Sequence, residues 1–424
     1  MIFLFFPSLK FFYKKTLNLF GLIINCAELP NAAAMTIQNR PRVESIDLLK
    51  GLVMVVMALD HTRDYFHSSA LLFDPTDPSQ TTLTLFFTRW ITHFCAPAFS
   101  FLAGLSVFFV GRRKAKSELS GYLIKRGLWL VFIELTFVNF AWYFDPQFRT
   151  FNLFVIWCLG VSMIVLAGLI HLQRKYILIF CLVLIFGHNL LDNIHFPGNF
   201  LWSVLHEFSI FKLSATHQIY TGYPLIPWIA VMALGYYFGS LYDGSFDPRK
   251  RRKILNILGV ASLGLFFVLR WTNSYGNPID WKTYNTVSQS LISFLNPLKY
   301  PPSLLYLLMT LGGIFLFLAN SENLKGRIVN FFSVFGRVPF FYYILHLYII
   351  HSVAMIFAQL SGFGWQKLIL SDWIAEVPGI KGYGFDLWVV YIVWAGIVLS
   401  LYPLCKKFDS YKLNNKGKWW LSYL

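Results

Sequence analysis

The stretch RVESIDLLKGLVMVVMALDHTRDYFH, residues 42–67, is apolar in the middle and charged at both ends. Asp47 and Lys50 lie near its start, and Asp60, His61 and Arg63 lie near its end. Asp47 and His61 are 14 residues apart, which is about 21 Å of α-helix, so the two side chains must serve different sites. The pattern predicts a helix that crosses a bilayer and carries a polar group at each face.

The composition of the whole chain agrees with a membrane protein. Of its 424 residues, 56% are hydrophobic and only 13% are charged, whereas a soluble globular domain has about 25% charged residues. So much apolar surface cannot be hidden inside one water-facing globule, which excludes most soluble folds. The net charge of +16 does not indicate nucleic-acid binding, because no polar domain is present to carry a basic face.

Apolar segments long enough to span about 30 Å of hydrocarbon recur along the chain. The sequence therefore predicts an all-α fold, a polytopic transmembrane helix bundle of about ten spans. We expect the spans near residues 46–60, 86–110, 122–143, 153–170, 176–190, 223–242, 254–271, 302–319, 338–359 and 386–405.

Lys and Arg are divided unevenly between the two sides of these spans. With the N-terminus inside, 26 of the 36 basic residues fall on cytoplasmic segments and 9 on the other side. Short cytoplasmic loops accumulate positive charge, so both termini are expected to be cytoplasmic. We expect a cytoplasmic or interfacial segment over residues 1–41, which becomes an upstream extension if translation starts at Met35, a membrane domain over 42–405, and a basic cytoplasmic tail over 406–424.

Four polar residues are expected near the outer mouth of the first two helices. A carboxylate beside an imidazole can raise its basicity, which makes Asp60 and His61 candidates for catalysis; a polar helix cap at the interface is the alternative. Arg89 and His93 are at i and i+4 in the next helix. Charged groups at this depth rarely face lipid, so both are expected to point into the bundle towards His61, unless Arg89 extends to the headgroups.

Two further ionisable residues lie deep in predicted spans, Glu134 in the third and His346 in the ninth. A lone carboxylate in hydrocarbon indicates a functional site or a proton relay, with polar contact between helices as the alternative. His346 and His351 are five residues apart, too far around a helix to bind one metal together at i, i+4 spacing. The chain also has no motif typical of nucleotide binding or of a serine hydrolase.

Five segments together resemble a known family. They are RVESIDLLKGL (42–52), DHTRDYFH (60–67), RWITHFCAPAFSFLAG (89–104), YPLIPWIAVMALGYYFG (223–239) and FGRVPFFYYILHLYIIH (335–351). As a set they are similar to bacterial membrane proteins of the heparan-alpha-glucosaminide N-acetyltransferase-like family, from about Arg42 to Tyr402. The resemblance implies a multi-pass protein of the bacterial cytoplasmic (inner) membrane, with a functional His after the first helix. His61 and His67 both compete for that role, and the helix favours His61.

The resemblance implies an integral membrane acyltransferase. It would move an acyl group, expected to be acetyl, from acetyl-CoA or another acyl-CoA to a hydroxyl or amine of a sugar or envelope glycan. His61 would act as base or acyl carrier, Asp60 would orient it, and Arg89 and His93 would stabilise the oxyanion or bind the acceptor. Glu134 completes the catalytic candidates.

The donor, the partners and the alternative functions follow from the same residues. Lys50, Arg337 and His346 are the candidates for binding the acyl-CoA, Trp202 and Trp281 could stack on sugar rings, and no metal is expected. The expected partners are the lipid bilayer and a sugar or glycan acceptor, without nucleic acid. Whether the protein forms a homo-oligomer is an open alternative. The alternative function is a proton-coupled transporter that uses Glu134 and the intramembrane His residues. A structural membrane protein is a third.

Overall fold

The structure of the protein is a computed structural model that describes residues 43–415 and 417–422. The predicted segment 1–41, with its candidate start at Met35, lies outside the described residues, and so do Arg42 and residues 416, 423 and 424 of the predicted tail.

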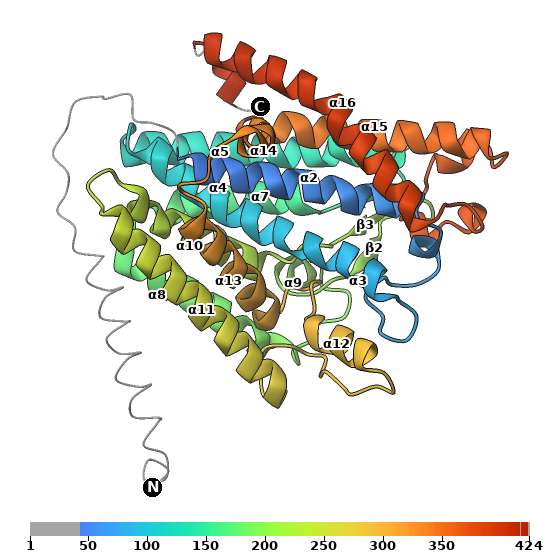
Figure 1. The fold of residues 1–424 in the computed structure, drawn as a ribbon, viewed down its shortest axis with the longest axis horizontal. Helices are drawn as coiled ribbons and strands as arrows, with labels where there is room; N and C mark the ends of the chain where they lie inside the picture. Colours follow the sequence, from blue (N-terminus) through green and yellow to red (C-terminus); the bar gives the residue numbers. More distant parts are fainter. Residues whose placement is uncertain (1–42, 416, 423–424) are drawn as a thin grey trace, which may run out of the picture.

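Helices make up most of the described chain and run together as one bundle (Figure 1). The first half contains α2 (Glu44–Phe66), α3 (Leu83–Trp90), α4 (Cys95–Gly111), α5 (Lys116–Ile133), α6 (Asn139–Tyr143), α7 (Val155–Leu169), α8 (Arg174–Gly187) and α9 (Phe200–Leu205). The second half contains α10 (Leu225–Phe238), α11 (Pro248–Thr272), α12 (Val287–Leu295), α13 (Leu304–Asn320), α14 (Arg327–Arg337), α15 (Pro339–Leu360) and α16 (Leu387–Asn414).

Among residues 43–415 and 417–422, six helical segments are long and apolar enough to cross a membrane. They are Leu83–Gly111, Arg174–Leu191, Leu225–Tyr242, Pro248–Thr272, Pro339–Leu360 and Leu387–Asn414. The helices α7 and α13 are apolar but shorter. Each of the ten expected segments contains a helix, so the helical bundle is confirmed, whereas the number of ten spans and the cytoplasmic position of both termini stay predictions.

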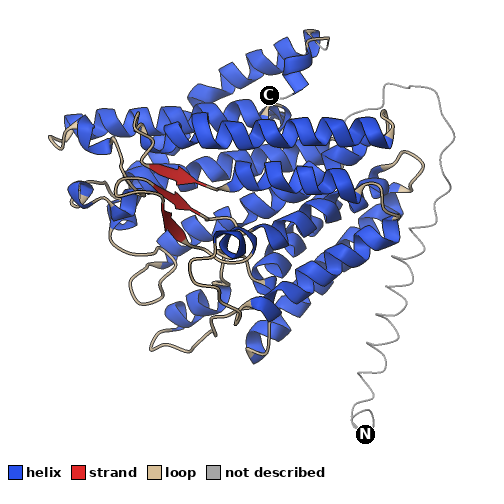
Figure 2. Ribbon diagram, turned by 180° about the vertical axis from the view of Figure 1, so that it is seen from behind, coloured by secondary structure: helices blue, strands red, loops and turns tan. Residues whose placement is uncertain are grey.

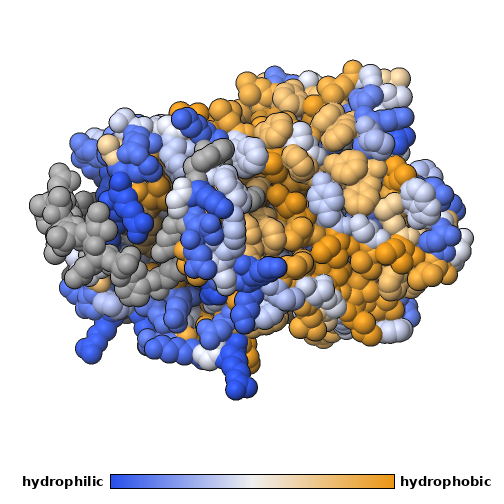
Figure 3. Space-filling view, turned by 90° about the horizontal axis from the view of Figure 1, so that it is seen from above, coloured by the Kyte–Doolittle hydropathy of each residue, from blue (hydrophilic) through white to orange (hydrophobic). Residues whose placement is uncertain are grey.

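The surface of the bundle is apolar where lipid would contact it. Hydrophobic residues cover the middle of the face in Figure 3, and hydrophilic residues gather towards its left end and again at its right edge. Val183, Val260, Leu360 and Ile392 are more than half exposed and lie on four different helices. Large apolar patches of this kind mark contact with a membrane or a partner rather than with water.

A small sheet that the all-α prediction lacks lies at one end of the bundle (Figure 2). Its strands are β1 (Thr150–Asn152), β2 (Ile210–Lys212) and β3 (Gln218–Tyr220), in the order β1-β3-β2. β1 is parallel to β3, with Thr150 opposite Gln218, and β2 is antiparallel to β3. Three residues are too few to show the alternating pattern by which a strand is recognised in a sequence.

α2 and α14 are in direct backbone contact. A Cβ atom on Gly51 would lie 1.7 Å from the carbonyl oxygen of Phe332, and one on Gly336 would lie 1.8 Å from that of Asp47. Glycine at both positions lets the two helices approach as closely as their backbones allow. The crossing therefore holds the start of α2 against the junction between α14 and α15.

Candidate active site

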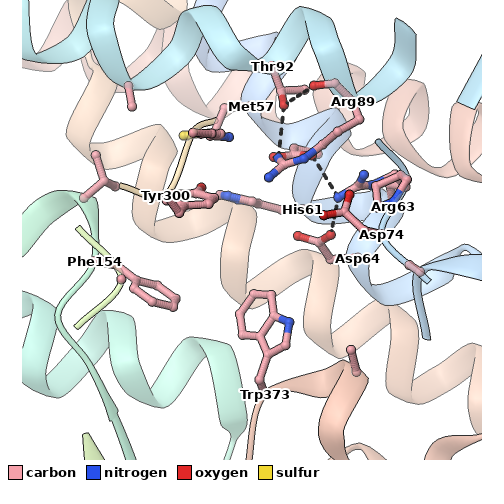
Figure 4. Close-up of a pocket in the computed structure, with 18 of the residues that line it drawn as sticks. Met57, His61, Arg63, Asp64, Asp74, Arg89, Thr92, Phe154, Tyr300 and Trp373 are labelled. Carbon is pink, nitrogen blue, oxygen red and sulfur yellow. Dashed lines mark hydrogen bonds and ion pairs between the residues drawn. The ribbon is translucent and has the colours of Figure 1, made fainter. Parts of the chain in front are cut away.

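A cavity of about 590 Å³ lies where α2 ends. We call it the His61 cavity. It is lined by residues of α2, by Arg89 and Thr92 from the α3–α4 segment, and by parts of several loops that include Asp74, Tyr300 and Trp373 (Figure 4). Tyr220 of the small sheet also lines it. The sheet and the loops therefore form one wall of the site.

His61 is held by a second histidine. Its Nδ1 lies 2.8 Å from Nε2 of His346 on α15, and the two rings stack at an angle of 18°. Nδ1 of His346 lies 3.1 Å from the carbonyl oxygen of Tyr342. Trp142 packs edge-on against the His61 ring, with 4.8 Å between the ring centroids.

This chain of contacts determines where the protons lie. A carbonyl oxygen can only accept, so Nδ1 of His346 carries a proton that it donates to Tyr342, and a neutral His346 ring then has a lone pair on Nε2. Nδ1–H of His61 donates to that lone pair. Nε2 of His61 is left with a lone pair, on a residue that lines the cavity. An imidazole in this state can act as a base or a nucleophile.

Asp60 contacts arginines rather than the ring of His61. Arg89 donates from Nη1 to Oδ2 of Asp60, and Nη2 of Arg63 lies 3.1 Å from Oδ1 of Asp60. Nη2 of Arg63 also lies 2.5 Å from Oδ1 of Asp64. From the sequence we expected Asp60 to orient His61, whereas in the structure the ring of His61 is hydrogen-bonded to His346.

His93 is buried beside the site and does not line the cavity. It is 2% exposed, and its ring meets the ring of Tyr306 edge-on at 5.6 Å. The hydroxyl of Tyr306 donates to the carbonyl oxygen of His93 at 2.7 Å. Of the expected trio His61, Arg89 and His93, the structure thus brings His61 and Arg89 to one cavity and sets His93 behind its wall.

His67, the rival of His61, lies outside the cavity. Its Nδ1 is 2.6 Å from the hydroxyl of Ser69, and its backbone pairs with Phe385 as an isolated β-bridge. The helix ends just before His67, and His67 is not among the residues that line the cavity.

Aromatic side chains form the wall opposite the charged group. Trp373 and Phe154 lie across the open space from Arg63, Arg89 and Asp64 (Figure 4). Trp142 and Trp373 are 5.4 Å apart between ring centroids. Such faces suit the apolar side of a sugar ring. Neither Trp202 nor Trp281, the tryptophans suggested from the sequence, is among the lining residues.

A second cavity, of about 440 Å³, lies around the start of α2. We call it the Lys50 cavity. Four of its lining residues are basic, namely Lys50, Arg126, Arg337 and Lys412, and one, Asp47, is acidic. Nζ of Lys50 donates to the hydroxyl of Ser106 at 2.9 Å, and Nε of Arg337 is 2.6 Å from the carboxylate of Asp409.

The Lys50 cavity has the charge that a phosphorylated ligand requires, because its basic side chains outnumber the single acid. Lys50 and Arg337, two of the three candidates for donor binding, are thus together. The third, His346, lies instead against His61.

The two cavities share a border. Phe99 of α4, Val155 of α7 and Tyr343 of α15 line both of them. Asp47 and His61 therefore line different cavities at opposite ends of α2, as their spacing predicts. The two cavities adjoin at this border.

Glu134 lines neither cavity and has a structural contact instead. It begins a π-helical turn (Glu134–Val138) between α5 and α6. Its Oε2 accepts the backbone N–H groups of Ile156, at 2.9 Å, and Trp157, at 3.1 Å. The N–H groups in the first turn of α7 have no carbonyl partner within the helix, and negative charge is stabilising at this end. Glu134 therefore anchors the start of α7, next to Val155 at the shared border.

Several lining residues escaped the sequence analysis. Lys299, Tyr300 and Trp373 come from loops, and no helical or alternating pattern links them to α2. The only signal for the turn that carries Lys299 is its three prolines in NPLKYPPS, residues 296–303. Within residues 43–415 and 417–422, no three His, Cys, Asp or Glu side chains form a group that could hold a metal ion.

One protein family matches the chain. Its model describes the catalytic domain of heparan-alpha-glucosaminide N-acetyltransferase and matches residues 42–270, which is more than half of the chain. The match begins with the stretch that forms α2 and includes His61 and Arg89. No curated protein matches the chain.

Proposed function

The chain belongs to the heparan-alpha-glucosaminide N-acetyltransferase catalytic family, and from this premise we propose that it is an integral membrane acyltransferase. It moves an acyl group, which we propose to be acetyl, from an acyl-CoA to a hydroxyl or amine of a sugar or envelope glycan. The observation that carries the proposal is the hydrogen bond between His61 and His346, which leaves a basic nitrogen at a cavity that contains an arginine and an aromatic wall.

His61 acts as the general base. Its Nε2 takes the proton of the acceptor O–H or N–H while the acceptor atom forms a bond to the acyl carbon. The carbon–sulfur bond of the thioester then breaks, and the proton passes from His61 to the leaving sulfur. Throughout the transfer, Nδ1 of His61 keeps its proton, because it donates that proton to the lone pair on Nε2 of His346.

An acyl-imidazole route uses the same lone pair. In that route Nε2 attacks the thioester and the acceptor attacks the acylated ring afterwards. The two routes differ in one measurable property: only the second leaves label on the protein when acyl donor is supplied without acceptor.

Arg89 supplies positive charge to the oxygen that becomes negative during the transfer. It lines the cavity with His61, and its bond to Asp60 fixes the guanidinium in place. A fixed cation of this kind stabilises developing charge without reorganisation. Trp373 and Phe154 would stack on the acceptor sugar.

The Lys50 cavity fits the donor. Coenzyme A bears phosphates at one end and supplies a thioester at the other. Lys50, Arg126 and Arg337 would hold the phosphates, since basic side chains predominate there. The shared border at Phe99, Val155 and Tyr343 supports a route from one cavity to the other.

We further propose that the protein is a multi-pass protein of the bacterial cytoplasmic membrane with ten spans and both termini in the cytoplasm. The membrane domain would comprise residues 42–405 and the basic tail 406–424. The uneven distribution of Lys and Arg supports this orientation. In this orientation the Lys50 cavity would lie on the side where acyl-CoA is made, and the His61 cavity on the side of the envelope. We prefer the acyltransferase to proton-coupled transport, because Glu134 lines neither cavity and its Oε2 is engaged by the start of α7.

A labelling experiment tests the proposal. The full-length protein in lipid nanodiscs is incubated with radiolabelled acetyl-CoA and an extract of envelope glycans. Wild type should transfer label, His61→Gln should not, and His67→Gln is the matched control that should retain activity because His67 lies outside the cavity. Absence of transfer by wild type from any acyl-CoA, together with pH-driven solute uptake that requires Glu134, would overturn the proposal in favour of a transporter.

A further inference from the structure

Lys299 is a buried cation without an acidic partner. It lines the His61 cavity and is only 9% exposed. None of the ion pairs in the described part of the chain involves it, although Asp60 lies close enough to feel its charge. Its Nζ lies 5.1 Å from the ring centroid of Tyr300. A charge in this position is costly unless it is paired, so a ligand with the opposite charge would satisfy it.

The turn that carries Lys299 is held in place by neighbours on several sides. The backbone of Lys299 pairs with Pro302, and the carbonyl oxygen of Pro302 lies 2.9 Å from Nε2 of the buried His188. The backbone N–H of Leu298 donates to Asn277 at 2.7 Å. The site is therefore built before a ligand arrives, which reduces the entropy lost on binding.

Arg63 also lines the cavity and adds a second positive charge whose hydrogen bonds are incomplete. Its side chain is nearly fully buried, and only Nη2 contacts the carboxylates of Asp60 and Asp64. Nε and Nη1 are buried and have no hydrogen-bond partner among the described residues.

The remaining acids of the cavity do not satisfy these cations. Asp60 is shared between Arg63 and Arg89. Asp74 accepts the N–H and hydroxyl of Thr76, and Glu376 is exposed. The buried wall of the cavity thus keeps cationic donors in excess of the acceptors available to them.

We propose that Lys299, aided by the positive charge of Arg63, forms an anion subsite of the His61 cavity that binds a carboxylate or phosphate group carried by the acyl acceptor. The identification of this ligand as the acceptor rests on the proposed function; the anion subsite itself does not. The phosphates of an acyl-CoA are an inferior fit here, because the Lys50 cavity already offers four basic side chains. The acceptor is then an acidic sugar or a sugar phosphate rather than a neutral glycan.

Calorimetric titration of the full-length protein in nanodiscs tests the subsite without any acyl donor. Glucuronate, glucose 6-phosphate and neutral glucose serve as probes. At least one charged sugar should bind wild type about tenfold more tightly than glucose, in line with about 1.4 kcal/mol per tenfold, and the tighter of the two indicates whether a carboxylate or a phosphate is the natural group. Lys299→Gln should abolish the preference and leave glucose binding unchanged, whereas Lys299→Arg should retain it.

Equal affinity for charged and neutral sugars in wild type, or an unchanged preference in Lys299→Gln, would overturn the inference. If Lys299→Gln does not fold, the salt dependence of wild type decides: the affinity for the charged sugar should fall several-fold between 50 and 500 mM NaCl, on the order expected for screening and anion competition, and a constant affinity would count against the subsite. Transfer activity without a charge preference would overturn only this inference, and a charge preference without transfer would overturn only the proposed function.

Discussion

Replacement of His346 tests whether the contact between two histidines sets the chemistry of the site. His346 lines neither cavity and acts through its contact with His61, so it is a positioning residue. In His346→Leu the side chain remains apolar and of similar bulk, but Nδ1–H of His61 loses its acceptor. The proton of the neutral His61 ring is then free to move to Nε2, and in that tautomer no lone pair faces the sugar that would accept the acyl group.

The size of the effect follows from the lost hydrogen bond. An unmade bond to a buried polar group costs about 1–3 kcal/mol, and each 1.36 kcal/mol changes a rate tenfold. We therefore expect kcat to fall by roughly 5- to 150-fold. KM for the donor should stay unchanged, because His346 is absent from the Lys50 cavity.

Initial rates of label transfer at several acetyl-CoA concentrations separate kcat from KM. His346→Gln is the matched variant, since its side-chain oxygen can accept from Nδ1 of His61, and it should recover most of the loss. Thermal unfolding of both variants checks that the bundle is intact. Wild-type kcat in a folded His346→Leu protein would refute the role of the histidine pair.

Three further changes test the packing at Gly51, the buried acid Glu134 and the ion pair of Asp145. Gly51→Val should lower the free energy of unfolding by about 1–3 kcal/mol, because its Cβ would lie 1.7 Å from the carbonyl oxygen of Phe332; an unchanged thermal transition in detergent would contradict this. Glu134→Gln keeps an oxygen that can accept both N–H groups, so transfer should stay within about threefold of wild type, and its complete loss would give Glu134 a role in the chemistry. Burial alone would raise the pKa of Asp145, but hydrogen bonds from the side chain and N–H of Arg149 lower it below its usual value. The folded state then binds this proton more weakly than the unfolded chain, so the stability that Asp145 contributes is present above about pH 4 and is lost as the pH falls through the lowered value. The difference in melting temperature between wild type and Asp145→Asn should therefore shrink from pH 6 to below pH 3, and a constant difference would be inconsistent with this assignment.

The helices could be predicted from the sequence because each depends on a local pattern. Apolar runs of the right length mark the helical segments, and the spacing of Asp47 and His61 along α2 correctly separates two polar regions. The strands of the small sheet are too short to leave such a pattern.

The partners of the site residues could not be predicted in the same way. His61 and His346 are 285 positions apart, and no periodicity connects α2 with α15. Asp60 is adjacent to His61 in the chain, yet adjacent residues of a helix point in different directions, so Asp60 meets Arg89 instead. Glu134 shows the same limit: burial in a span indicated either a functional site or polar contact between helices, and only the structure shows that its Oε2 contacts the start of α7.

The border that Phe99, Val155 and Tyr343 form between the cavities has a consequence for bioenergetics. With one cavity open to each side of the bilayer, as proposed, the electrical insulation of the membrane narrows at this point to the thickness of a few side chains. A cell that stores energy as a proton gradient cannot tolerate a continuous file of water there. Under that proposal the same three side chains would have to admit a reactive group and still block ion leakage, and they would form the permeability barrier of the protein.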